Sequence, residues 1–172
     1  MMFVNCPRSF LVVGLESSCS RHVSILLALN LGIVPVNEWD GEDKVENKSH
    51  RVVHRSLPHK YRENFIGERY WMSFQTVVLC TRDINCSLES KIMWHQHERK
   101  AAEKENQTGV QIMSKILAKH PKVEIFSYES AYIMGKAYNE VFFKKIGVPY
   151  VHHIETQEIN SKYMRGQNPC SV

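Results

Sequence analysis

The feature that most constrains the fold is a regular alternation of short apolar runs with longer stretches of helical spacing. Buried strands are predicted by four runs rich in apolar residues, at 10–14, 51–58, 75–81 and 122–129. Helices are predicted by the stretches 21–31, 85–106, 108–121 and 130–147. Because successive parallel strands need a crossover between them, this alternation is typical of an α/β protein with a parallel sheet.

Length and composition fit one such domain. The chain has 172 residues, of which 43% are hydrophobic, and this predicts a single domain over residues 1–172 with a core of its own. We expect a three-layer sandwich with a central, mostly parallel sheet. The net charge of +4 suits an anionic ligand but is too small to indicate nucleic acid.

The cysteines and the longest apolar runs bear on the compartment. The five cysteines form no CxxC pair and their number is odd, which favours reduced thiols and a cytoplasmic protein. No apolar run approaches the roughly 20 residues that span a bilayer, so we expect no membrane span. The sequence leaves the oligomeric state open.

The end of the first predicted strand carries the segment GLESSCSR, residues 14–21, which leads directly into a helix. Unpaired N–H groups at a helix N-terminus attract phosphate or sulfate, and serine hydroxyls and Arg21 add further donors. A Walker A loop would need a glycine and a lysine where Cys19 and Ser20 stand. A serine-rich helix cap without a ligand is an equally weighted interpretation of these residues alone.

The end of the third predicted strand adds a second candidate. In TVVLCTRDINCSLESK, Arg82 follows the strand directly and Ser90 comes eight residues later on the next helix. Since ligands of parallel sheets bind beyond the carboxyl ends of the strands, both side chains are predicted to face the same crevice. The alternative is a surface Arg82–Asp83 turn and a serine facing solvent.

Taken together and in order, these segments resemble the sulfotransferase family, which uses 3′-phosphoadenosine 5′-phosphosulfate and has a P-loop-kinase-like fold. SSCSR (17–21) stands where the family has its [K/R]-S-G-T-[ST] loop, and Arg82 with Ser90 matches its spacing of an arginine and a serine. Tyr128–Glu129, the later Gly-Val-Pro at 147–149 and VVHRSLP (52–58) are further points of resemblance, and the likeness covers roughly residues 10 to 149.

The resemblance implies a sulfotransferase that moves a sulfuryl group to a hydroxyl or amine acceptor, without a metal. It implies that Ser17, Ser18, Cys19, Ser20 and Arg21 bind the 5′-phosphosulfate side of the cofactor. It assigns Arg82 and Ser90 to the 3′-phosphate, and it leaves the acceptor open among carbohydrate, small molecule and peptide.

A histidine is the expected general base. In family members with K-T-H-L-P the histidine acts as base, but Ser56 stands at that position here, and His54 stands where the lysine would be. His54 is the predicted base because an imidazole titrates near neutral pH and this one lies at the carboxyl end of a strand. A histidine bonded to backbone is nearly as strong an interpretation.

Two departures from the family pattern keep other functions open. Ser17 replaces the basic residue of the loop, and Cys19 replaces its glycine. The Cβ of Cys19 would crowd the cofactor or oppose a positive φ. A non-catalytic nucleotide- or partner-binding protein on a degenerate fold is therefore one alternative. A small P-loop-like nucleotide kinase is another, although the loop lysine is absent. The histidine pairs His95/His97 and His152/His153 do not complete a metal site by spacing.

Overall fold

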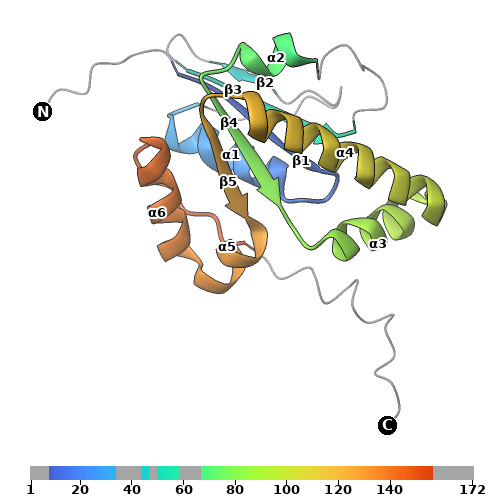
Figure 1. Ribbon diagram of the computed structural model, residues 1–172. Coiled ribbons are helices and arrows are strands. Elements are labelled where there is room, and N and C mark those ends of the chain that lie inside the picture. The colour runs from blue at the N-terminus through green and yellow to red at the C-terminus, as the bar shows by residue number, and fades with distance from the viewer. Residues whose placement is uncertain (1–7, 34–43, 47–49, 59–66, 157–172) are drawn as a thin grey trace, which may run out of the picture.

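A computed structural model describes residues 8–33, 44–46, 50–58 and 67–156, in which a five-stranded sheet has helices on both faces (Figure 1). The strand order is β2-β3-β1-β4-β5, so β1 is central. Strands β3, β1, β4 and β5 are parallel, and only β2 runs antiparallel, beside β3. The strands are β1 (Arg8–Leu15), β2 (Lys44–Glu46), β3 (His50–Leu57), β4 (Thr76–Thr81) and β5 (Val123–Ser127).

The helices form two layers around this sheet (Figure 1). Helices α1 and α6 cover one face, and α4 with the short α2 covers the other. The predicted architecture, an α/β sandwich with a central and mostly parallel sheet, is confirmed. The helices are α1 (Ser20–Asn30), α2 (Glu68–Met72), α3 (Ile84–His95), α4 (Arg99–Lys119), α5 (Tyr128–Met134) and α6 (Lys136–Ile146).

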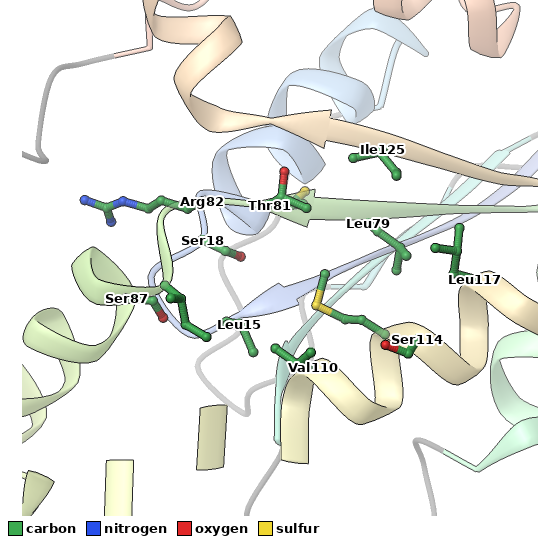
Figure 2. Close-up of a pocket in the computed structure, with 13 residues that line it drawn as sticks. Leu15, Ser18, Leu79, Thr81, Arg82, Ser87, Val110, Ser114, Leu117 and Ile125 are labelled. Carbon is green, nitrogen blue, oxygen red and sulfur yellow. The ribbon is translucent and has the colours of Figure 1, made fainter. Parts of the chain in front are cut away.

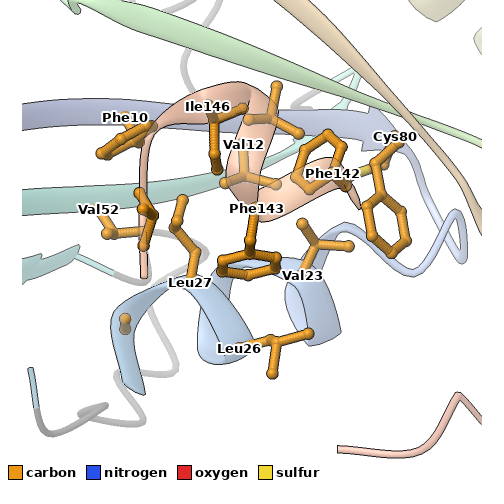
Figure 3. Close-up of a cluster of buried hydrophobic side chains, with 14 of the residues drawn as sticks. Phe10, Val12, Val23, Leu26, Leu27, Val52, Cys80, Phe142, Phe143 and Ile146 are labelled. Atoms are coloured by element: carbon orange, nitrogen blue, oxygen red, sulfur yellow. The ribbon is translucent and has the colours of Figure 1, made fainter. Parts of the chain in front are cut away.

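The core lies on both faces of the sheet because the parallel strands are apolar on both sides. On one face Val12 of β1 packs with Leu27 of α1 and with Phe142 and Phe143 of α6 (Figure 3). On the other face Leu11 and Val13 pack with Trp71 and with Ile116 of α4. Alternate residues of β1 thus enter opposite layers, and this fixes which way the side chains at its carboxyl end point.

The four predicted strands are all present with small shifts of their ends, whereas three helix boundaries were predicted wrongly. The predicted helix 85–106 ends early, because Gln96 adopts a left-handed conformation (φ 51°) that closes α3. The predicted helix 130–147 is two helices, broken at Gly135 with φ 55°. Asp83 caps α3, since its carboxylate accepts hydrogen bonds from the amides of Asn85 and Cys86.

Helix α4 runs unbroken from Arg99 to Lys119, through residue 107, where a boundary between two helices was predicted. Gly109 lets α4 approach the carboxyl ends of β1 and β3. A Cβ at this position would lie 2.4 Å from Leu15 Cδ2 and 3.3 Å from Leu57 Cβ. The glycine is therefore a contact point between helix and sheet and not a helix end.

Two further observations concern expectations about the compartment. In the described ranges, Cys19, Cys80 and Cys86 are free thiols, and the other two cysteines lie outside those ranges. None of the helices in the described part of the chain combines the length and the hydropathy that a membrane crossing requires.

Candidate functional site

The candidate site is a cavity at the carboxyl edge of the parallel strands. The strand register aligns Gly14 of β1 with Ser56 of β3 and Cys80 of β4, so the residues that follow these strands gather at one edge. The cavity there has a volume of about 640 Å³. Its lining residues are Glu16, Ser17, Ser18, Cys19, Ser20, Arg21, His22, His54, Ser56, Arg82, Tyr128, Ile154, Glu155 and Thr156.

The loop between β1 and α1 has the backbone conformation that the sequence argued against. Ser17 has φ 64° and Cys19 has φ 69°, so both hold left-handed conformations that glycine adopts most readily. Cys19 is the N-cap of α1 and makes no side-chain capping hydrogen bond, and Ser20 is the first helical residue. The first amides of α1 have no carbonyl of a preceding turn to bond, and this end of the helix opens on the cavity.

Gly14 and Ser18 pack tightly under this loop. A Cβ on Gly14 would lie 2.0 Å from Ser18 Oγ and 2.9 Å from the carbonyl oxygen of Cys80, so the strand can end here only with glycine. Ser18 is 2% exposed, and its hydroxyl makes no hydrogen bond within the described residues. A buried hydroxyl without a partner costs about 1–3 kcal/mol, and this favours a water or a ligand group beside it.

Arg82 links the end of β4 to the first loop. Its Nη1 donates a hydrogen bond of 2.6 Å to the carbonyl oxygen of Ser17, and its guanidinium lies 4.9 Å from the centre of the Tyr128 ring. The side chain is 8% exposed and lines the cavity. The structure therefore brings the two segments that the sequence singled out, 17–21 and 82–90, into direct contact.

Ser90 is placed differently from the prediction that it faces the crevice. It is 2% exposed, is not part of the cavity lining, and its Oγ lies 2.6 Å from Ser17 Oγ. The reason is the short distance between the start of α3 and the loop, which brings the two hydroxyls together. In this arrangement Ser90 holds the loop, and a contact between Ser90 and a phosphate would require the bond to Ser17 to open.

Two more contacts fix the loop to α3. Ser87 Oγ donates a hydrogen bond of 2.8 Å to the carbonyl oxygen of Glu16. Lys91, whose side chain has no exposed surface, lies 3.9 Å from the Glu16 carboxylate and 3.2 Å from that of Glu105 on α4. The buried ammonium thus pairs with carboxylates from both sides, and it fixes the position of the loop relative to α3 and α4.

His54 lies at the floor of the cavity on the α1 side of the sheet. It is 9% exposed, and its Nε2 is 2.9 Å from Ser20 Oγ. Arg55 points to the opposite face, as the strand period predicts, and its guanidinium lies 5.6 Å from the centre of the Tyr70 ring. The histidine therefore contacts the loop helix, and the pair Ser20–His54 is positioned to move a proton at the cavity surface.

Tyr128 lines the cavity but was not among the predicted site residues. It follows β5 directly and is 2% exposed beneath Arg82. The next residue, Glu129, accepts a hydrogen bond of 2.8 Å from the amide of Asp83 and so ties the ends of β4 and β5 together. The rule that placed Arg82 at the carboxyl edge applies equally to the residue after β5, so the signal was available in the sequence.

Burial changes the titration of two cavity residues. Burial raises the pKa of the Cys19 thiol to about 12, against a lowering effect of Arg82. Cys19 is therefore a neutral thiol at neutral pH and not a nucleophilic thiolate. Burial lowers the pKa of His22, and His153 acts in the same direction. His22 is thus held neutral, and the positive charge on the cavity wall comes from Arg21 and Arg82.

Within the described ranges, no three histidine, cysteine or acidic side chains lie close enough together to hold a metal ion. The cavity also contains the carboxylates of Glu16 and Glu155, of which Glu16 faces Lys91. What the geometry offers chemically is an anion site. It consists of a helix N-terminus, serine hydroxyls and two arginines, with a histidine at one side.

Comparisons with known proteins identify no family for this chain. No protein-family model matches the sequence, and no curated protein matches it. Among solved structures, the chain is similar to a crystal structure from Encephalitozoon cuniculi in complex with GDP, described as an ADP-ribosylation-factor-like GTP-binding protein, the small COPII coat GTPase SAR1. The identity is 13% and the TM-score 0.40, over 84% of this chain and 83% of that one. The α/β assignment rests on the sheet order itself, and the P-loop-like description on the strand–loop–helix unit at β1.

Proposed function

We propose that the protein is a sulfotransferase that binds 3′-phosphoadenosine 5′-phosphosulfate in the cavity at the carboxyl edge. It would move the sulfuryl group to a hydroxyl or amine acceptor. The observation that carries the proposal is that the entire loop 17–21, Arg82 and His54 line one cavity of about 640 Å³. Residues 65 positions apart that contact each other at a helix N-terminus support a site for a phosphorylated ligand.

The proposed roles follow from the charges and donors on the cavity wall. The amides at the start of α1 receive the phosphosulfate, and Arg82 supplies a buried positive charge beside them. In the proposal Ser90 positions Ser17 and does not bind the 3′-phosphate, the role that the resemblance gave it. The proposed site needs no lysine in the loop, because Arg21 and Arg82 lie in the same cavity.

The chemistry asks for positioning and for stabilisation of charge on the leaving phosphate. The bond between the sulfur and the 5′-phosphate oxygen breaks, and the electron pair stays on 3′-phosphoadenosine 5′-phosphate. A new sulfur–oxygen bond forms with an acceptor hydroxyl, whose proton passes to His54. Since Ser20 Oγ lies 2.9 Å from His54 Nε2, Ser20 can donate its own proton to the imidazole while it takes the acceptor's.

Calorimetry with 3′-phosphoadenosine 5′-phosphate tests the binding step. Arg82→Ala is expected to weaken binding at least about tenfold, or about 1.4 kcal/mol. Arg99→Ala is the matched control, because Arg99 is an exposed arginine that pairs with Glu89 outside the cavity. Arg82 also supports the loop through its bond to the Ser17 carbonyl, so Arg82→Ala removes both a charge and a loop contact. Arg82→Lys, which keeps the charge, is therefore measured in parallel to distinguish a loss of charge from a loss of loop structure. Unchanged affinity in a folded Arg82→Ala variant contradicts the assignment.

Transfer of radiolabelled sulfate to a panel of acceptors tests turnover. His54→Ala is expected to lower turnover more than it lowers nucleotide affinity, with the exposed His152→Ala as control. Equal turnover in the two variants makes His54 structural. Nucleotide binding without any transfer points to the non-catalytic alternative, and a preference for ATP with magnesium points to the kinase alternative.

A further inference from the structure

A second cavity lies on the α4 side of the sheet, next to the anion site. It has a volume of about 260 Å³, and its walls come from the ends of β1 and β4, from β5, from the start of α3 and from α4 (Figure 2). Its lining residues are Leu15, Ser18, Leu79, Cys80, Thr81, Arg82, Ile84, Ser87, Val110, Met113, Ser114, Leu117 and Ile125. We define this as the α4 pocket.

The walls of the α4 pocket are apolar and partly open to solvent. Ile84, Val110, Leu117 and Ile125 are 40–53% exposed, which is unusual for large apolar side chains gathered around one hollow. The cause lies in the topology: α4 packs on β1 and β3, while β5 is the edge strand of the sheet. The face of β5 that carries Ile125 is therefore left without a helix in the described part of the chain.

One end of the α4 pocket is polar and is shared with the anion site. Ser18 and Arg82 line both cavities, and Figure 2 shows them at one end of the pocket, with Leu117 at the other. Ser18 is 2% exposed, and its hydroxyl lacks a hydrogen-bond partner in the described residues. A ligand that fills the pocket would thus meet one unsatisfied hydroxyl at this end, while the guanidinium of Arg82 is directed away from the pocket toward the Ser17 carbonyl (Figure 2).

We propose that the α4 pocket binds the acceptor of the transfer reaction, and that the acceptor is a small alcohol or phenol with an apolar body. This inference rests on the proposed function and specifies its substrate class. The apolar body would lie between Leu79, Val110 and Ile125, and the hydroxyl would hydrogen-bond to Ser18 at the boundary with the anion site.

Size and polarity select this class among the acceptors that the sequence leaves open. An apolar cavity of about 150 Å³ takes one benzene ring, so about 260 Å³ takes one ring or a short chain with a few further atoms. A carbohydrate would bury most of its hydroxyls against the apolar side chains that make up the larger part of the walls. A protonated amine would meet the like charge of Arg82. In the transfer, the acceptor oxygen forms a bond to sulfur, and its proton passes to His54 in the adjoining anion site, as in the proposed function. The bond between sulfur and the 5′-phosphate oxygen breaks, and its electron pair stays on the leaving bisphosphate.

Methionine methyl resonances test the binding site directly. Met113 lines the pocket, whereas Met72, Met93 and Met134 are exposed elsewhere, so one sample reports the site and three background signals. The other three of the seven methionines lie outside the described residues. We would titrate 4-methylphenol into protein labelled with ¹³C at the methionine methyl groups, without nucleotide, and use glucose as the polar control. The Met113 signal would be identified with Met113→Leu.

A bulky substitution gives a matched pair of variants. Val110→Trp places an indole in the pocket, and Val141→Trp is its control, because Val141 is also an exposed helical valine but lies on α6. We expect 4-methylphenol to shift the Met113 signal saturably and Val110→Trp to weaken that binding by about tenfold or more. Val141→Trp and glucose should have no such effect. In the transfer assay Val110→Trp should raise KM for 4-methylphenol and leave nucleotide affinity unchanged.

The outcomes separate this inference from the proposed function. If Met113 does not respond, or if Val110→Trp binds 4-methylphenol as well as Val141→Trp does, the inference is wrong even when the nucleotide binds. If Met113 responds but 3′-phosphoadenosine 5′-phosphate does not bind, the proposed function fails and the acceptor role fails with it. Sulfate transfer to glucose in preference to 4-methylphenol also overturns the inference.

Discussion

The left-handed conformation of Cys19 can be tested by comparing two substitutions of the same residue. Cys19, the residue before α1, has φ 69° and ψ 7°. The sulfotransferase loop that residues 17–21 resemble has glycine at this position. Cys19→Gly and Cys19→Ala both remove the half-buried thiol. The difference between the two variants therefore reports the effect of a single Cβ at this position.

The expected difference follows from two opposing free energies. A Cβ in the left-handed region costs about 1–2 kcal/mol relative to glycine. Glycine also has more conformational freedom in the unfolded chain, and this lowers the stability of the glycine variant by about 0.4–1 kcal/mol relative to alanine. Cys19→Gly should thus be more stable than Cys19→Ala by roughly 0.5–1 kcal/mol. At an ordinary helical position the sign is reversed, because glycine there is less stable than alanine by about 0.5–1 kcal/mol.

Urea unfolding followed by circular dichroism measures this difference. With a slope of about 2 kcal/mol/M, the unfolding midpoint of Cys19→Gly should exceed that of Cys19→Ala by roughly 0.3–0.5 M. Gln111, an exposed residue in the middle of α4, serves as control, and there Gln111→Ala should be the more stable variant. If alanine equals or exceeds glycine at position 19 as well, the loop does not hold the conformation described here.

Three further perturbations are expected to act through contacts described above. Gly109→Ala should lower the free energy of unfolding by about 1–3 kcal/mol, because the added Cβ would lie 2.4 Å from Leu15 Cδ2. Helix propensity alone would favour alanine, so an unfolding midpoint no lower than that of the unaltered protein contradicts this prediction. Ser17→Ala and Ser90→Ala should show a coupling free energy of about 0.5–1.5 kcal/mol in a double-mutant cycle of urea unfolding, and simple additivity would disprove the bond. Because burial lowers the pKa of His22 below 6.5, its contribution to stability is complete above pH 6.5 and is lost as the pH falls through the lowered pKa. His22→Gln should flatten the fall of the urea midpoint between about pH 7.5 and about pH 5, and an unaltered pH profile would refute the argument.

The sequence predicted the sheet well because the signal for each strand is local. The runs 10–14 and 75–81 are almost wholly apolar, and burial on both faces of a parallel sheet requires this. The helix breaks were not predictable in the same way. Gln96 ends α3 by adopting a conformation that its residue type seldom takes, and the close contact of Gly109 with Leu15 depends on the packing of α4 on the sheet.

The candidate site was predictable at the level of segments but not of contacts. The rule that parallel strands end at one edge placed Arg82 and His54 near the first loop, and both line the cavity with it. The same rule could not foresee that Ser90 bonds to Ser17, because that contact depends on the path of α3. The ligand assignments for these residues remain predictions from the resemblance.

The contacts between the loop and α3 explain how the loop between β1 and α1 keeps left-handed conformations at two residues that are not glycine. Left-handed conformations at Ser17 and Cys19 together cost about 2–4 kcal/mol. The charge-assisted bond from Arg82 to the Ser17 carbonyl contributes about 1.5–3 kcal/mol, and the neutral bonds made by Ser90 and Ser87 contribute about 0.5–1.5 kcal/mol each. The two sums are similar, so the loop holds this conformation only while α3 and the end of β4 are in place. Arg82 therefore affects any anion bound here in two ways, through its own charge and through the loop amides that it keeps in position.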